Sequence, residues 1–67
     1  MDLLTVPEVA KILRTNKNYV YQLHNAGLLR FIKLGSYKIR RETLQEFLET
    51  YDGFDVTNPF EIKELRP

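Results

Sequence analysis

Residues 15–25 carry polar side chains suited to hydrogen bonding with the edges of nucleic-acid bases. Thr15-Asn16 has the form of a helix N-cap, which predicts a helix over residues 17–25. Val20 and Leu23 then face inward and leave one side of the helix polar. The polar side chains are Asn16, Lys17, Asn18, Tyr21, Gln22 and Asn25. Asn and Gln can form paired hydrogen bonds with adenine in the major groove, and Lys can reach guanine or phosphate.

Polar surface helices far outnumber recognition helices, so an ordinary solvated face is the alternative for these side chains. The charge pattern favours nucleic acid. Between Val9 and Arg41 there are eight basic residues and no acidic one, although the whole chain has a formal net charge of only +1. The basic residues are Lys11, Arg14, Lys17, Arg30, Lys33, Lys38, Arg40 and Arg41. A cationic block of this kind attracts a polyanion by releasing its condensed counterions.

A basic β-hairpin is expected to follow this helix. Gly27 stands where a left-handed residue ends a helix, and residues 29–34 form the first strand. Gly35-Ser36 suits a two-residue turn, after which Tyr37 and Ile39 alternate with basic residues. The predicted contacts of this hairpin are Lys33, Ser36, Lys38 and Arg40. Such a hairpin can straddle a DNA backbone or enter the minor groove, and the alternative is an edge strand protected from aggregation by Lys.

Two further helices should support these elements. Thr5 and Glu8 form a capping-box pattern that starts a helix ending near Leu13 or Arg14. A third helix runs from Arg41 or Glu42 to about Asp52, with an apolar stripe of Leu44, Phe47, Leu48 and Tyr51. The outer side of the third helix carries Glu42, Glu46 and Glu49, which we interpret as a solvated face that points away from DNA rather than as an acid–base pair.

Residues 54–67 form a tail after Gly53. Asn58-Pro59-Phe60-Glu61 resembles a helix cap, which predicts a short helix through Leu65. The apolar residues of this tail could dock on the domain or bind a partner.

Composition excludes several classes of function. Sixty-seven residues make one small domain, and the absence of Cys removes disulfides and thiolate metal sites. His24 is the only histidine and lacks partners for a metal site. No nucleophile–base pair or phosphate-binding Gly loop is visible, so we expect neither an enzyme nor a cofactor. No apolar run approaches the roughly 20 residues of a membrane span, and a soluble, cytoplasmic protein without membrane contact is expected.

The order of these elements resembles the small excisionase-type helix-turn-helix family, which is related to the DNA-binding domain of MerR regulators. The resemblance lies in residues 4–13, 16–23 and 25–29, and it continues through the hairpin to Phe47-Leu48. It implies that the second helix enters the major groove through Lys17, Asn18, Tyr21 and Gln22, with Lys38 and Arg40 on the wing. Two departures stand out: Ser36-Tyr37 occupies a position where relatives place a basic pair, and Tyr21 stands where Arg is frequent.

The fold class predicted is α+β and mostly helical: a small winged helix-turn-helix of three helices and a two-stranded hairpin over residues 1–53, followed by the tail. We expect sequence-specific binding of double-stranded DNA, with phosphate contacts from Lys11, Arg14, Lys33, Lys38, Arg40 and Arg41. The resemblance implies an excisionase-like factor that bends attachment-site DNA, contacts an integrase through its tail and self-associates cooperatively on DNA. A small transcriptional regulator of the same fold and a protein-interaction module remain alternatives.

Overall fold

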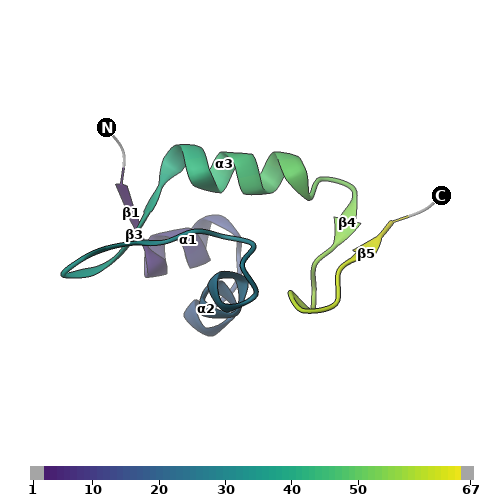
Figure 1. Ribbon diagram of the computed structural model, residues 1–67, viewed down its shortest axis with the longest axis horizontal. Coiled ribbons are helices and arrows are strands. Elements are labelled where there is room, and N and C mark those ends of the chain that lie inside the picture. The colour runs from purple at the N-terminus through teal and green to yellow at the C-terminus, as the bar shows by residue number, and fades with distance from the viewer. Residues whose placement is uncertain (1–2, 66–67) are drawn as a thin grey trace.

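The computed structural model describes residues 3–65, which form three helices and two small antiparallel sheets (Figure 1). The elements are β1 (Leu3–Thr5), α1 (Val6–Ile12), α2 (Lys17–Asn25), β2 (Ile32–Leu34), β3 (Ser36–Arg40), α3 (Arg41–Thr50), β4 (Phe54–Asp55) and β5 (Lys63–Glu64). This arrangement confirms the predicted α+β class and is consistent with a winged helix-turn-helix. Within residues 3–65, no helix has the length and apolar character needed to cross a membrane.

Side-chain caps set the first residues of α1 and α2. The Glu8 amide donates to Thr5 Oγ1 at 3.2 Å, and the Thr5 amide donates to Glu8 Oε1 at 2.8 Å, which completes the predicted capping box. These hydrogen bonds, with that of the Thr5 amide as the largest cause, lower the pKa of Glu8. At α2, the Tyr19 amide donates to Asn16 Oδ1 at 2.8 Å. The predicted boundaries of α2 are confirmed.

The main sheet contains a strand that the sequence analysis did not assign. Its order is β1-β3-β2, all antiparallel, and Leu4 of β1 pairs with Ile39 of β3. Residues 3–5 are too few to show the two-residue alternation that marks a strand. Their conformation comes from pairing with β3, a contact distant in the sequence.

The turn of the β2–β3 hairpin is tighter than predicted. Leu34 pairs with Ser36, so the expected two-residue turn at Gly35-Ser36 is wrong and Gly35 alone lies between paired residues. Gly35 has a φ of +80°, a left-handed conformation that glycine adopts without steric cost. Ser36 therefore belongs to β3 rather than to the turn.

The tail forms a small hairpin in place of the predicted helix. Phe54 pairs with Glu64 and Asp55 with Lys63, so no helix forms within the described part of the tail, residues 54–65. The Asn58 side chain explains the difference, because its Oδ1 accepts from the Phe60 amide at 3.0 Å and closes a turn two residues long. A helical cap would instead receive the amide three residues ahead.

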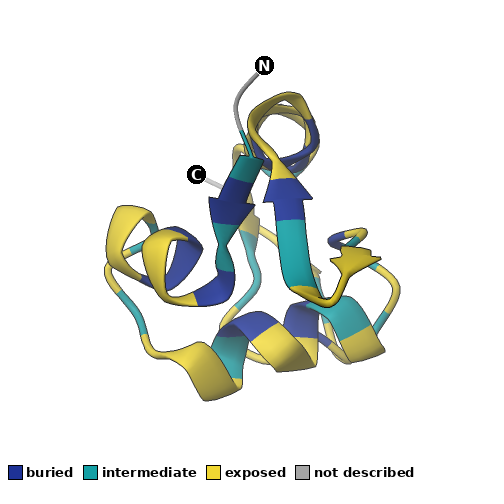
Figure 2. Cartoon of the chain, turned by 90° about the vertical axis from the view of Figure 1, so that its left-hand side faces the viewer, coloured by how far each residue is buried: buried dark blue, intermediate teal, exposed yellow. Residues whose placement is uncertain are grey.

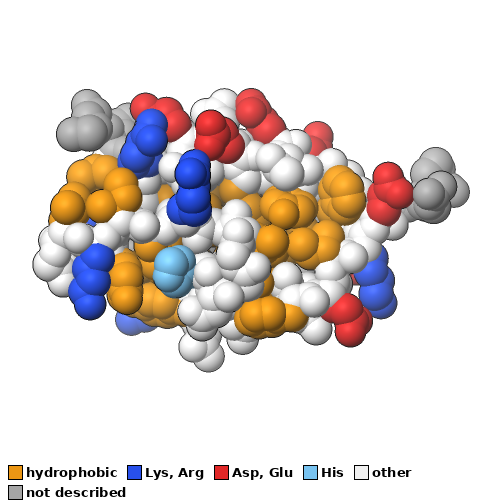
Figure 3. All heavy atoms as spheres, viewed as in Figure 1, with side chains coloured by type: hydrophobic (Ala, Val, Ile, Leu, Met, Phe, Trp, Pro, Cys, Tyr) orange, Lys and Arg blue, Asp and Glu red, His pale blue; other side chains and the backbone are white. Residues whose placement is uncertain are grey.

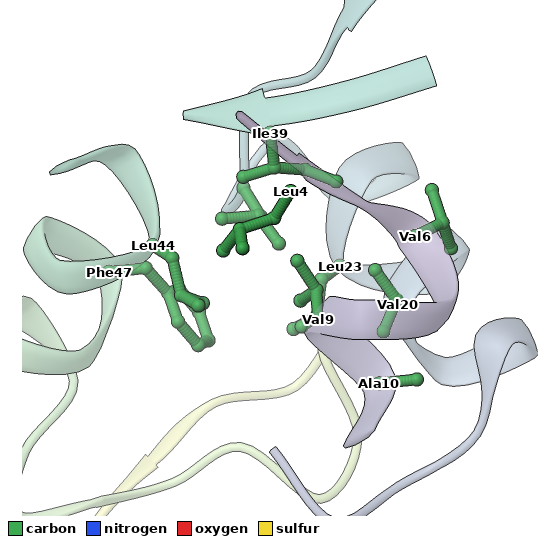
Figure 4. Packing of buried hydrophobic residues seen from close by; sticks show 10 residues of the cluster. Leu4, Val6, Val9, Ala10, Val20, Leu23, Ile39, Leu44 and Phe47 are labelled. Carbon is green, nitrogen blue, oxygen red and sulfur yellow. The ribbon is translucent and has the colours of Figure 1, made fainter. Parts of the chain in front are cut away.

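All three helices and the main sheet contribute to one hydrophobic core (Figure 4). Its fully buried large side chains are Val9, Val20, Leu23, Leu29 and Ile39. In Figure 4, Leu44 and Phe47 of α3 point toward the same centre as the side chains of α1 and the sheet. The inward orientation predicted for Val20 and Leu23 is thus confirmed.

The tail is connected to this core through Tyr19 of α2. The Tyr19 hydroxyl donates to the Val56 carbonyl, and both residues are partly buried beside the core. Burial, followed by the charge of Asp55, raises the pKa of Tyr19, which keeps the hydroxyl protonated and able to donate. One side of α2 therefore carries the tail.

We predict that Tyr19→Phe destabilises the protein by about 1 kcal/mol, because the Val56 carbonyl loses its donor in a partly buried place. Urea unfolding followed by circular dichroism measures the change. Tyr21→Phe, at an exposed position of the same helix, is the matched control and should change stability by less than about 0.5 kcal/mol. Equal losses in the two variants would contradict the role given to the Tyr19 hydroxyl.

Candidate nucleic-acid interface

The exposed side of α2 gathers five of the six polar residues predicted there. With about 100° of rotation per residue, the five fall within an arc of roughly 140°: they are Lys17, Asn18, Tyr21, Gln22 and Asn25. All five are exposed, whereas Val20 and Leu23 on the other side are buried. Figure 2 shows α2 below the sheet, with its buried residues toward the core and its exposed ones away from it. The oxygen of the sixth residue, Asn16, is used by the cap.

The N-terminus of α2 has an uncompensated positive charge. A helix N-terminus carries a partial positive charge, which favours Asp or Glu in the first turn. Both α1 and α3 follow this preference, with Glu8 and Glu42 respectively. Helix α2 has no acidic residue there and begins with Lys17. The free amides, the dipole and the ammonium group together favour an anion at this end, as a DNA phosphate would be.

A cluster of aromatic rings fixes the hairpin against the other end of α2. His24 stacks on Phe31, with ring centroids 4.2 Å apart and planes 6° apart. Its Nδ1–H donates to the Leu29 carbonyl at 3.3 Å. Tyr21 meets Phe31 edge-on at 6.0 Å and Tyr37 at 6.2 Å. These contacts set the direction in which the hairpin leaves the helix.

The sequence analysis missed this function of His24 and Phe31. His24 lies three residues after Tyr21, so their placement on one flank of the helix follows from helical spacing. The stacking partner belongs to a different element, and nothing in the local pattern indicates it.

The two faces of the hairpin carry different cations. Lys33 and Tyr37 pair across the strands and share a face, and Lys33 Nζ lies 5.1 Å from the centre of the Tyr37 ring. Lys38 and Ser36 lie on the opposite face, where Lys38 Nζ donates to Ser36 Oγ at 2.6 Å. Arg40 is on the same face as Lys38, farther from the turn. The hairpin therefore presents a lysine on each side, an arrangement suited to phosphates on both sides of a groove.

Several predicted contact residues lie close to carboxylates instead of forming one uninterrupted basic surface. Arg40 Nε lies 3.8 Å from Glu42 Oε1, and Arg30 pairs with Glu46 at 3.7 Å. The charges of Arg41 and Lys38 are close enough to Glu8 to contribute to its lowered pKa, after the Thr5 hydrogen bonds. Exposed ion pairs of this kind contribute little energy, but they reduce the net positive charge of this part of the surface.

Most of the remaining acidic residues lie on the far side of the molecule. In Figures 1 and 2, α3 and α2 lie on opposite sides of the core. Glu42, Glu46 and Glu49 of α3 are exposed. In the view of Figure 3, Asp and Glu side chains gather along α3, and none is visible over α2 or the hairpin. The prediction that the acidic side of the third helix points away from the polar face of the second is confirmed.

The other predicted contacts are exposed but lie outside this face. Lys11 is in the last turn of α1, and Arg14 is in the turn that leads to α2. Arg14 has a φ of +57°, a left-handed conformation that is uncommon for a residue with a side chain. Among the described residues, no group of three or more His, Asp or Glu side chains is placed to hold a metal ion.

We predict that Phe31→Ala destabilises the protein by about 1–3 kcal/mol, less than the loss at a fully buried phenylalanine because Phe31 is only half-buried. The variant should also bind DNA more weakly, since the hairpin loses its support on α2. Leu34→Ala, on the opposite face of the hairpin and 58% exposed, should change stability by less than about 0.5 kcal/mol. Urea unfolding and gel-shift titration measure the two effects, and similar losses in both variants would contradict the importance of the cluster.

Comparison with known proteins agrees with this geometry. The family model described as a helix-turn-helix domain matches residues 3–52, three quarters of the chain. That span runs from β1 to the end of α3 and includes the polar face of α2 and the hairpin. Among curated proteins and solved structures, none gives a significant match. The chain therefore belongs to the helix-turn-helix domain family, which is a family of DNA-binding domains.

Proposed function

We propose that this protein binds double-stranded DNA sequence-specifically, with α2 in the major groove and the β2–β3 hairpin against the neighbouring backbone or minor groove. The observation that carries the proposal is the exposed face of α2. It combines amide-bearing side chains, a lysine at the positive end of the helix dipole and no carboxylate. Such a face can hydrogen-bond to bases and neutralise phosphates.

The structure supports a division of labour among the candidate contacts. Base contacts are assigned to the exposed residues of α2, which are Lys17, Asn18, Tyr21, Gln22 and Asn25. Phosphate contacts are assigned to Lys11, Arg14, Lys33 and Lys38, with Asn16 and Ser36 in supporting positions. Arg40 and Arg41 contribute less, because Glu42 and Glu8 share their surroundings.

Within DNA binding, we propose the role of an excisionase-type factor that bends attachment-site DNA and assists an integrase. The support is the resemblance of residues 4–29 to excisionase-type and MerR-related proteins, together with the position of the tail. The tail packs on α2 through Tyr19 and leaves Phe60 64% and Leu65 60% exposed. A recombinase bound beside this protein on DNA could contact these side chains, and adjacent copies could bind cooperatively.

A reconstituted recombination reaction tests this role. With the integrase encoded beside the gene, adding the protein should raise excision between attachment sites at least about tenfold. Phe60→Gln should lower excision while retaining DNA affinity. Normal DNA bending and binding without any effect on excision would instead favour the alternative, a small transcriptional regulator of the same fold.

We predict that Gln22→Ala and Lys33→Ala affect DNA binding in different ways. Gln22→Ala should cost about 1–3 kcal/mol on the specific site and relax the preference at one or two base pairs. Lys33→Ala should weaken binding to all sequences alike. Five phosphate contacts give a slope of log K against log salt of about −4.5 for the unaltered protein, and Lys33→Ala should make it shallower by about 1.

Gel shifts on specific and random duplexes over a range of salt concentrations measure these effects. Arg40→Ala is the matched control for Lys33→Ala, since both are exposed cations of the hairpin and Arg40 faces Glu42. It should change the slope by less than Lys33→Ala does. A wild-type slope shallower than about −2 would exclude the electrostatic part of the proposal.

A further inference from the structure

An apolar groove lies between the end of α1 and the outer side of α3. Its volume is about 480 Å³, and its apolar lining comes from Ile12, Leu44 and Leu48. Ile12 is 46% exposed and Leu48 is 45% exposed, so the groove leaves two large aliphatic side chains in contact with water. Leu48 belongs to the apolar stripe of α3, which is wider than the surface that the core covers.

One end of the groove is strongly acidic. Glu49 and Asp52 line it and are exposed, and neither forms an ion pair within residues 3–65. They stand at the C-terminus of α3, where the helix dipole is negative and basic residues are favoured. The last turn of α3 contains no basic residue. This end therefore holds two carboxylates where the helix dipole already disfavours negative charge.

The arrangement breaks a local rule of helix stability beside an exposed apolar surface. Such conflicts concentrate at functional sites, because the missing interaction is supplied by a partner. A nucleic acid or an anionic membrane is repelled by this end. The groove also lies on the α3 side of the molecule, across the core from the exposed face of α2. A partner bound in it would leave the proposed DNA-binding face open.

We propose that this groove binds a protein segment with an amphipathic helix, whose apolar side packs on Ile12 and Leu48 and whose Lys or Arg residues reach Glu49 and Asp52. Helix-in-groove recognition uses apolar anchors at helical spacing and gains direction from charges at the rim. The proposal goes beyond DNA binding and concerns a surface distinct from the tail. Protein and DNA could then be bound at the same time.

Titration of the ¹⁵N-labelled protein with two designed peptides tests the proposal. Each peptide has about 14 residues, long enough to be partly helical, with Leu and Phe on one side. One has Lys and Arg on its polar side, and the other has Glu in their place. The basic peptide should shift the amide resonances of Ile12, Leu48 and the last turn of α3 in a saturable way, and the acidic peptide should not.

Variants distinguish this groove from other exposed surfaces. Leu48→Gln should weaken binding of the basic peptide at least about fivefold, because it removes an apolar anchor. Phe60→Gln, which alters an exposed apolar residue of the tail, is the matched control and should leave it unchanged. Glu49→Lys should weaken peptide binding and raise the thermal midpoint of the free protein, since Lys suits the negative end of the helix.

Several outcomes would overturn the proposal. These are the absence of shifts, equal shifts from the two peptides, shifts confined to α2 or the tail, and unchanged binding by Leu48→Gln. Movement of the groove resonances on dilution of the protein alone would assign the groove to a second copy. DNA affinity of Leu48→Gln, measured in parallel, should match that of the unaltered protein, so failure of the groove and failure of the DNA-binding proposal are separable.

Discussion

The burial of Ile39 determines how the hairpin presents its side chains. Ile39 is completely buried, paired with Leu4 on one side and enclosed by the core. Since successive side chains of a strand point to opposite faces, this anchor sends Tyr37 toward α2 and Lys38 away from it. A shift of one residue in the pairing would exchange the two faces. It would bury charged groups and remove the aromatic contacts between the hairpin and α2.

The same anchor explains why α2 has three different flanks. Tyr21 and His24 contact the hairpin on one flank, and Tyr19 contacts the tail on the other. Val20 and Leu23 fill the core. What remains is a single exposed strip of polar residues between two supports. Rigid support on both flanks limits the freedom of the helix and lowers the entropic cost of placing it in a groove.

The sequence predicts the helices well because their signals are local. The capping box at Thr5, the cap at Asn16 and the apolar spacing of Leu44 and Phe47 each lie within a few residues of the element they specify. The exposed strip on α2 follows from the same spacing. Strand β1 and the β4–β5 hairpin could not be predicted in this way, since each forms by pairing with a distant segment. The Asn58 signal failed because Asn caps helices and closes short turns equally well.

The proposed interface shows a similar limit. Sequence order places eight cations in one block, yet folding brings Arg30 and Arg40 beside glutamates of α3. The sequence contains both members of each pair, but the pairs Arg30–Glu46 and Arg40–Glu42 follow from where β3 meets α3. A charge count along the chain therefore overestimates the cations available to DNA, whereas the residues of α2 keep the roles that helical spacing gives them.

Separation of charge across the molecule reconciles a net charge of only +1 with binding to DNA. The described residues extend 22 Å along the direction that separates α2 from α3 in Figure 1, and 19 Å along the shortest axis. At physiological ionic strength, charges separated by more than about 8 Å are largely screened from each other. A phosphate beside α2 therefore experiences Lys17 and the helix dipole far more than the carboxylates of α3. The acidic side then disfavours approach in the wrong orientation and costs little once α2 is in contact.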